Sequence, residues 1–376
     1  MNQNFSGPEI PWWSVLHTSS ELPLLKEVIQ SNYLNEGEFV EKFENKIKEI
    51  LGVRYVIACT SGTTALFLAL KACGIKPGDL VAVPNLTFVA TANAVKLAGA
   101  EPVLIDVCKE TLTICPDQLM EAGKKHAIKA VIPVHVSGRS AFKNGLIEVC
   151  KKLKLKIIED AAEAFGSMDP FIKQKLGTIG NAGAFSFSPN KIVTSGQGGV
   201  VVTNDENIAR RVTQLKDQGR PTRGTGGADI HANEGYNFKF TNLQAAVGLA
   251  QLGEFDSRKE HLINVNKHYQ ANFLDCKHQF MPKFDVANGE FPLWPEIYSK
   301  NRKGLISKLV VKKIGYREIW FPLSSQRIHS KLKFQGYKNS LDVSKHTIWL
   351  PSSFKLSETS LNIISKSLKC ELCSNE

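Results

Sequence analysis

The chain has 376 residues, of which 43% are apolar and 22% are charged. These proportions are typical of globular proteins and exclude a disordered tail, a collagen-like fibre and a disulfide-stapled miniprotein. A chain of this length exceeds what one hydrophobic core usually organises, so we expect a large domain over residues 1–250 and a smaller one over residues 251–376.

The chain is basic: 47 Lys and Arg residues outnumber 36 Asp and Glu residues, and the formal net charge is +11. Such an excess of positive charge favours anionic partners through long-range attraction. The basic residues are spread along the chain without an aromatic-rich stacking motif, so we expect no nucleic-acid partner. A phosphorylated small molecule explains the charge equally well.

Nothing in the sequence indicates a membrane segment or secretion. The apolar stretch 80–95 is shorter than the ~20 residues that a membrane helix needs, and the N-terminus lacks the basic start and apolar core of a signal peptide. We therefore expect a cytoplasmic protein with reduced cysteines. The pair Cys370 and Cys373 has metal or redox spacing, but it stands alone near the chain end, so we expect no metal site.

From residue 54 to residue 204, short apolar runs alternate with amphipathic segments, a rhythm typical of an α/β fold. The nearly continuous apolar character of these runs indicates a sheet covered on both faces. A helix over residues 64–73, closed by Gly74, follows the first strand. The expected strands are 55–58, 80–83, 101–105, 130–133, 156–159, 183–188 and 198–203.

A longer helix is expected after the capping pattern that joins Thr241 to Gln244. It runs to about residue 273, with a bend near Gly253, and we interpret it as the bridge to the second domain. Beyond residue 275 the sequence favours a smaller α+β unit.

The first chemical motif is a turn of small residues, 61–64, between a strand and a helix. Unpaired N–H groups and the helix dipole make such a turn a phosphate site. A plain helix cap at Ser61 or Thr63 fits the pattern equally well. The turn is neither a Walker loop nor a dinucleotide fingerprint, which argues against a nucleotide-sugar oxidoreductase.

The second motif places Glu159 and Asp160 at the carboxyl end of a strand, where open α/β sheets bind their ligands. Burying a carboxylate is costly unless a cation lies close to it, and a protonated pyridine nitrogen is such a cation. A helix cap at Asp160 is the alternative interpretation.

The third motif is Lys191, which lies between the strand 183–188 and the Gly-rich segment 196–199. Desolvation in an apolar, Gly-rich environment lowers the pKa of a lysine and frees its amine to form a Schiff base. Taken alone, Lys191 could be an ordinary exposed lysine, as most lysines are. Together, a phosphate turn, an acid and a lysine correspond to three contacts of pyridoxal 5'-phosphate (PLP).

The three motifs belong to a larger set of short segments, which are 61–66, 84–88, 159–163, 185–187, 190–191, 196–199 and 235–237. With them the chain resembles, over nearly its whole length, the DegT-type sugar-nucleotide aminotransferases, which are PLP enzymes of fold type I. The resemblance implies a large PLP-binding domain with a mostly parallel, seven-stranded sheet between helices. It also implies a homodimer with shared active sites.

The resemblance further implies a role for each matching residue. Lys191 binds the cofactor covalently, and Asp160 pairs with the pyridine nitrogen. The other cofactor contacts that it implies are Phe88 on the ring, Gly62, Thr63 and Ser186 on the phosphate, Asn237 from the neighbouring subunit, and Glu163 near the ring hydroxyl. Many relatives carry Gln or His in place of Glu163, and Glu is typical of the perosamine-synthase branch.

The implied reaction moves an amino group from an amino acid, expected to be L-glutamate, to a keto group of a nucleotide-linked keto-deoxy sugar. Such reactions make amino sugars for surface polysaccharides. Relatives that dehydrate keto sugars carry histidine in place of Lys191, so the resemblance favours a transaminase. A non-catalytic regulator that binds PLP or a sugar nucleotide is a further alternative, which the intact Lys191 and Asp160 disfavour.

Two departures from the family pattern concern the acceptor. Lys239 stands where relatives commonly have Arg, which offers a different hydrogen-bond geometry, and the segment 320–324 lacks their usual His. A smaller phosphorylated ketone therefore stays an alternative acceptor. We expect Trp320, Lys239, Arg220 and His231 to contact substrate, and the basic segment 219–227, with Arg223, to order over its phosphates. A plain surface loop is the alternative for this segment, and an ordinary loop histidine is the alternative for His231.

Overall fold

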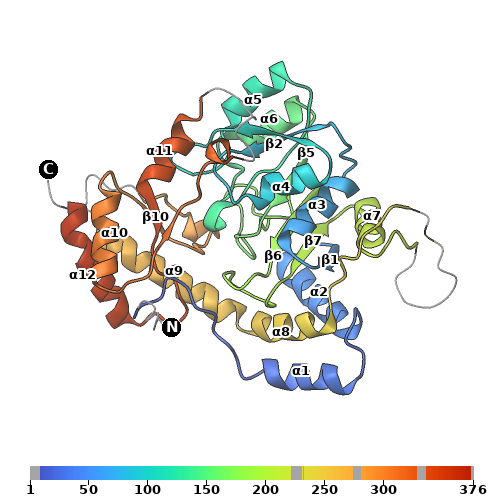
Figure 1. Ribbon diagram of the computed structural model, residues 1–376, viewed down its shortest axis with the longest axis horizontal. Helices are drawn as coiled ribbons and strands as arrows, with labels where there is room; N and C mark the ends of the chain where they lie inside the picture. The colour runs from blue at the N-terminus through green and yellow to red at the C-terminus, as the bar shows by residue number, and fades with distance from the viewer. Residues whose placement is uncertain (1–8, 222–230, 232, 274–280, 328–335, 374–376) are drawn as a thin grey trace.

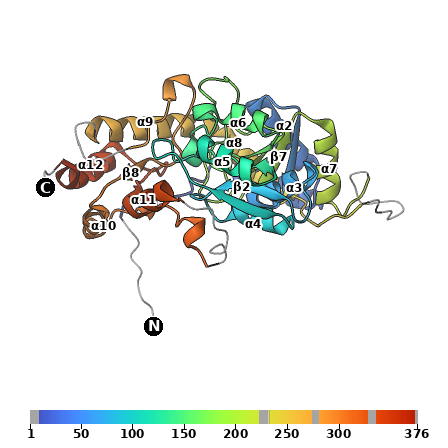
Figure 2. The ribbon, with the colours of Figure 1, turned by 90° about the horizontal axis from the view of Figure 1, so that it is seen from above.

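The computed structural model describes residues 9–221, 231, 233–273, 281–327 and 336–373, except for the side chains of residues 370–373 (Figure 1). A seven-stranded sheet with its helices forms one part of the molecule. A three-stranded sheet with the helices that surround it forms the other part, and Figure 2 shows the two side by side.

The large sheet is mostly parallel, as predicted. β7 runs antiparallel to both of its neighbours, β1 and β6, whereas the other neighbouring pairs are parallel. The expected strands agree with the observed ones to within two residues at each end. Across the sheet the order is β1 (Tyr55–Cys59), β7 (Gly199–Thr203), β6 (Ala182–Ser186), β5 (Lys156–Asp160), β4 (Ile128–Val131), β2 (Leu80–Pro84) and β3 (Glu101–Ile105).

Both faces of this sheet are covered, because successive residues of a strand enter different hydrophobic clusters. On β2, Val81 and Val83 pack into one cluster and Ala82 into another, as the two-residue period of a strand requires. The helices around the sheet are α1 (Glu21–Gln30), α2 (Glu38–Leu51), α3 (Gly62–Ala72), α4 (Ala90–Leu97), α5 (Pro116–Lys125), α6 (Leu146–Lys152), α7 (Glu206–Lys216) and α8 (Asn242–Gly253).

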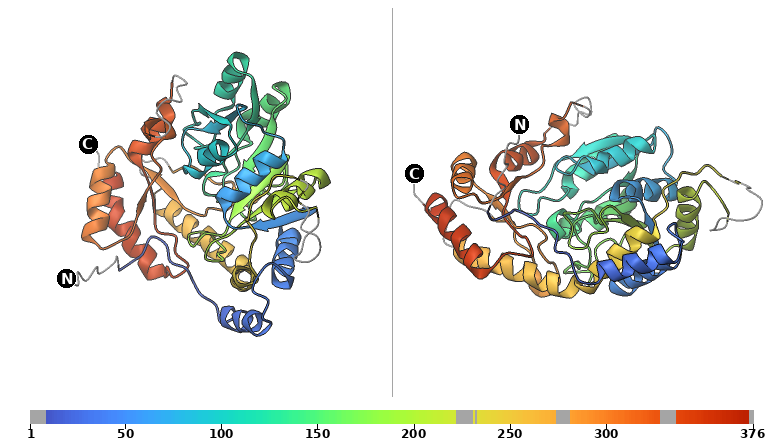
Figure 3. Two further views of the ribbon diagram at one scale, coloured as in Figure 1. Left: turned by 45° about the vertical axis from the view of Figure 1, so that its right-hand side comes forward. Right: turned by 60° about the horizontal axis from the view of Figure 1, so that its bottom comes forward.

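The bridging helix begins where it was predicted. The Thr241 side chain accepts a hydrogen bond from the Gln244 N–H, and the Gln244 side chain accepts one from the Thr241 N–H. α8 then packs against α1 and α2 (Figure 3). It ends at Gly253, and α9 (Phe255–Phe273) begins two residues later, so the expected bend is a break between two helices.

The end of α9 belongs to a second packed unit, which we call the C-terminal unit. Its sheet has the order β8 (Glu296–Tyr298), β10 (Thr347–Trp349) and β9 (Arg317–Glu318), all antiparallel. Its helices are α10 (Arg302–Val311), α11 (Lys338–His346) and α12 (Glu358–Cys373). An α+β unit at this end of the chain was expected, while the domain boundary at residue 250 stays a prediction.

The backbone of residues 10–14 lies against the C-terminal unit. Ile10 forms a parallel bridge with Ile314, and the Gly315 N–H donates to the Ile10 carbonyl at 2.7 Å. The first described residues therefore lie beside the C-terminal unit, as Figure 1 shows.

Within the described residues, no helix combines the length and the apolar character needed to cross a membrane. The side chains of Cys370 and Cys373 lie outside the described residues, as does Arg223.

Candidate active site

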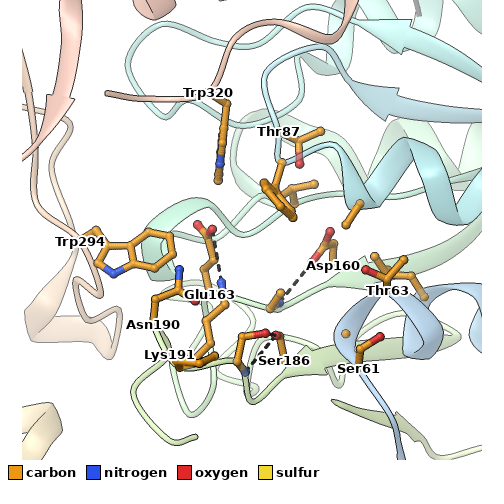
Figure 4. Close-up of a pocket in the computed structure, with 18 of the residues that line it drawn as sticks. Ser61, Thr63, Thr87, Asp160, Glu163, Ser186, Asn190, Lys191, Trp294 and Trp320 are labelled. Atoms are coloured by element: carbon orange, nitrogen blue, oxygen red, sulfur yellow. Dashed lines mark hydrogen bonds and ion pairs between the residues drawn. The ribbon is translucent and has the colours of Figure 1, made fainter. Parts of the chain in front are cut away.

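A cavity of about 390 Å³ opens at the carboxyl ends of β5 and β6, between the large sheet and the C-terminal unit (Figure 4). This is the edge at which α/β sheets bind ligands. One wall consists of residues from the sheet, α3 and the loop after β6. The other wall is formed by Trp294, Arg317 and Trp320.

The turn before α3 forms part of the first wall. Ser61 caps the helix, because its side chain accepts from the Thr64 N–H at 3.2 Å and its own N–H donates to Thr64 Oγ1 at 2.9 Å. Gly62, at the first position of the helix, lies so close to β6 that a Cβ added there would lie 2.8 Å from Ser186 Cβ. Glycine is required here by close packing, and it brings the start of α3 and Ser186 to one place. The turn is therefore both a helix cap and a wall of the cavity.

Asp160 ends β5 and is 6% exposed. The Thr91 hydroxyl donates to its Oδ2 at 2.8 Å, and the Ala162 N–H donates to its Oδ1 at 3.2 Å. Burial raises the pKa of Asp160, while these hydrogen bonds and the nearby Lys191 oppose the rise. None of the described residues places a Lys or Arg nitrogen within 4 Å of this carboxylate, so it is ready to pair with a cation in the cavity.

The neighbouring Glu159 points away from the cavity, as alternation along a strand requires. Its carboxylate lies 2.9 Å from His135 Nε2. It also accepts hydrogen bonds from the backbone N–H groups of Gly177, Ile179 and Gly180 at 2.6–2.7 Å. Of the two adjacent acids, Asp160 alone lines the cavity.

Lys191 follows β6 in a tight turn, where its N–H donates to the Ser188 carbonyl at 3.1 Å. Its Nζ lies 3.6 Å from Glu163 Oε1 and 4.7 Å from the centre of the Trp294 ring. Burial lowers the pKa of Lys191, and the charges of Glu163 and Asp160 oppose this effect. Burial likewise raises the pKa of Glu163, whose other oxygen accepts from the Ser137 N–H at 2.9 Å. A buried amine beside two buried acids is the environment expected of a reactive lysine.

Comparison with known proteins identifies the family. The model of the DegT/DnrJ/EryC1/StrS aminotransferase family matches residues 16–369. The chain belongs to this family. It is 33% identical to the GDP-perosamine synthase of Escherichia coli O157:H7, over 96% of this chain and 97% of that protein. It is 34% identical to the GDP-perosamine synthase of Caulobacter vibrioides, over 87% of this chain and 88% of that protein.

A solved structure agrees with this assignment. The crystal structure of a DegT/DnrJ/EryC1/StrS aminotransferase from Brucella abortus matches with a TM-score of 0.87 and 30% sequence identity, over 94% of this chain and 96% of that chain. The present chain is thus a PLP-dependent aminotransferase with the predicted fold.

The cavity of this aminotransferase fits PLP. The close approach of Gly62 to Ser186 at a helix N-terminus suits the phosphate group. The buried Asp160 suits a protonated ring nitrogen, and the buried amine of Lys191 suits the aldehyde. Phe88 lines the same cavity and is 52% exposed, which leaves its ring available for stacking.

The structure brings together eight of the twelve residues that were expected to bind cofactor or substrate. They are Gly62, Thr63, Phe88, Asp160, Glu163, Ser186, Lys191 and Trp320. Their individual roles stay predictions, but all of them line one cavity.

The other four expected residues do not line the cavity of the same chain. Lys239 Nζ lies 2.7 Å from Asp217 Oδ1, and Arg220 Nη1 lies 3.8 Å from the same oxygen. Asn237 forms a backbone bridge with Asp217. His231 Nδ1 hydrogen-bonds at 2.7 Å to the carbonyl of Gln218, which follows Asp217 in the chain. These four residues form a separate group around residues 217–218. That they contribute to the active site of a second subunit stays a prediction.

Two residues of the cavity wall, Trp294 and Arg317, were not predicted. Trp294 follows the apolar run 291–293, and Arg317 begins a strand of only two residues. The signal that was available is the grouping of aromatic residues around both of them, in the segments 291–298 and 316–321.

Proposed function

We propose that this aminotransferase transfers the amino group of L-glutamate to the keto group of a nucleotide-linked keto-deoxy sugar, in the synthesis of amino sugars for surface polysaccharides. The observation that carries the proposal is the buried Lys191 amine, 3.6 Å from Glu163, in one cavity with Asp160. The names of the relatives in Escherichia coli and Caulobacter vibrioides support the class of acceptor.

The residues of the cavity divide the chemistry between them. PLP, when bound, supplies an electron sink for the carbon that loses a proton. Asp160 keeps the ring nitrogen protonated, so that the sink is effective. The Lys191 amine takes the proton from the donor carbon and later returns a proton at the acceptor, acting as general base and then as general acid. Glu163, 3.6 Å away, holds this amine and balances its charge.

The donor needs a cation for its carboxylate, and Arg317 is suited to this role. The other charged residues that line the cavity are Asp160, Glu163 and Lys191, of which two repel a carboxylate and the third is used for proton transfer. A guanidinium offers paired N–H donors that match the two oxygens of a carboxylate.

For the acceptor, we infer that a homodimer completes the site. Trp320 lies in the wall of the cavity, while Lys239, Arg220 and Asn237 lie in the group around Asp217. Mixing two inactive variants tests the sharing of sites: Lys191→Ala and Asn237→Ala subunits should regain part of the activity when they exchange. If the mixture stays inactive while mixed dimers form, each site belongs to one chain.

The reaction itself is tested by mass spectrometry of a panel of keto-sugar nucleotides incubated with the enzyme, PLP and L-glutamate. The expected result is the mass gain that replacing a ketone oxygen by an amine produces, in at least one member, and its loss in the Lys191→Ala control. A gain only with small phosphorylated ketones would replace the proposed acceptor. Formation of the PLP absorbance band without turnover of any ketone would indicate a regulator.

A further inference from the structure

The five tryptophans of the chain form a single cluster. Trp294 and Trp320 line the cavity, and Trp349 packs against both with ring centres 5.2 and 5.0 Å away. Trp12 and Trp13 come from the opposite end of the chain.

Residues 10–14, which we call the N-terminal strap, are fixed to the C-terminal unit by their backbone. Besides the contacts of Ile10, the Ser352 N–H donates to the Trp12 carbonyl at 3.1 Å. Ser14 Oγ lies 2.5 Å from Ser353 Oγ. Gly315 lies so close to the strap that a Cβ added to it would be 2.4 Å from the backbone nitrogen of Trp12.

The side chains of the N-terminal strap contact Arg317 directly and the surroundings of Lys191. Trp13 Nε1 donates to the Pro189 carbonyl at 3.1 Å, two residues before Lys191. The Trp12 ring lies 5.5 Å from the Trp294 ring, which itself lies 4.7 Å from Lys191 Nζ. The guanidinium carbon of Arg317 lies 5.3 Å from the Trp12 ring.

We propose that the N-terminal strap is a positioning element of the active site: Trp13 fixes the loop that carries Lys191, and Trp12 fixes Trp294 and Arg317. Neither tryptophan lines the cavity, so both act through the residues that they hold. The part that concerns Arg317 rests on the proposed function, because it assumes a carboxylate donor. A strap that moved away would loosen the wall around Lys191 and admit water.

Gly315→Ala tests the proposal from outside the cavity, because its new methyl group must displace the backbone of Trp12. Gly253→Ala is the matched control, since a Cβ there meets nothing within 4 Å. Trp13→Phe is the second variant, which keeps an aromatic ring and removes the N–H that donates to Pro189.

The first measurement is the pH dependence of PLP capture by the cofactor-free protein, followed by absorbance. Capture requires the neutral amine, and burial lowers the pKa of Lys191, so the wild type captures PLP at lower pH than an exposed lysine would. In Gly315→Ala and Trp13→Phe, we expect the midpoint to move upward by about 0.5 unit or more, as desolvation weakens. Gly253→Ala should match the wild type.

The second measurement is kcat/KM for the amino donor, which should fall about tenfold to a hundredfold in the strap variants, because a displacement of ~1 Å has such effects. The proposal is wrong if both strap variants retain the capture midpoint and the donor kcat/KM of Gly253→Ala. If Gly315→Ala does not fold, Trp13→Phe decides. A shifted capture midpoint without turnover of any keto sugar would keep the strap proposal and reject the proposed acceptor.

Discussion

The two walls of the cavity differ in how their residues come together. The sheet wall collects Asp160, Ser186 and Lys191 from consecutive strands and their end loops, so each residue occupies a place set by its own segment. The C-terminal wall collects Trp294, Arg317 and Trp320, which depend on a small sheet and on the N-terminal strap. We infer that the sheet wall carries the chemistry common to the family and that the C-terminal wall selects the substrates.

Loss of the amine in the sheet wall should have the largest effect on activity. Lys191→Ala removes the group that moves the proton, so kcat should fall by at least about a thousandfold. Single-turnover measurement with L-glutamate checks this, and Lys191→Arg, which keeps a charge without a suitable amine, should be equally inactive. A Lys191→Ala enzyme with a tenth of wild-type activity would contradict the assignment.

Asp160→Asn should have the next largest effect, because an amide cannot hold the ring nitrogen protonated. We expect kcat to decrease by about a hundredfold or more, with PLP still bound through Lys191. The absorbance spectrum of the bound cofactor and the rate of the donor half-reaction measure the two effects separately. An unchanged half-reaction would show that Asp160 serves only the packing of β5.

Arg317→Ala is the corresponding test in the C-terminal wall. The KM for L-glutamate should rise by about ten- to a hundredfold, the worth of a paired charge-assisted hydrogen bond. The acceptor KM should change little, which distinguishes a donor site from an acceptor site. Arg317→Lys should recover only part of the loss, since lysine lacks the paired donors. A rise confined to the acceptor KM would place the acceptor's phosphates at Arg317.

Trp320→Phe should have a smaller effect, on the acceptor alone. Its ring packs 5.0 Å from Trp349, and a smaller ring loses part of that contact, so we expect the acceptor KM to rise about two- to tenfold. Steady-state kinetics at saturating L-glutamate give the value. A change in the donor KM of the same size would mean that the two substrates share this surface.

The smallest expected effect is on the stability of the cofactor-free protein. Burial raises the pKa of Asp160 above its unfolded value, so the folded protein binds the proton more tightly, and ionisation costs stability as the pH rises through the folded pKa. Asp160→Asn removes this cost. Its melting temperature should exceed that of the wild type at pH 8, and the difference should shrink as the pH falls. A difference that does not depend on pH would contradict this explanation.

Sequence reasoning predicted the sheet wall because its residues follow local rules. The end of an apolar strand locates Asp160, a small-residue turn before a helix locates Gly62, and the capping pair Thr241 and Gln244 locates the start of α8. The residue type at Gly253 predicted a bend, and the structure has the end of α8 at this residue.

The C-terminal wall could not be predicted in the same way. Arg317 lies in a strand of two residues, which is too short to show the alternation of apolar and polar residues that identifies a strand. Its position depends on pairing with Trp349. Trp12 reaches it from the other end of the chain, and no local pattern in either segment announces the contact. The group around Asp217 is a different case, because its residues lie outside the cavity of their own chain, and the resemblance implied a neighbouring subunit only for Asn237.

Glu159 shows how the fold chooses between two adjacent acids. Sliding β5 by one position would turn Asp160 to the back of the sheet and present Glu159 to the cofactor. The hydrogen bonds that Glu159 receives from Gly177, Ile179 and Gly180 would all be lost in that shifted arrangement. Glu159, which lies outside the cavity, thus stabilises the register of β5 that turns Asp160 toward the cavity.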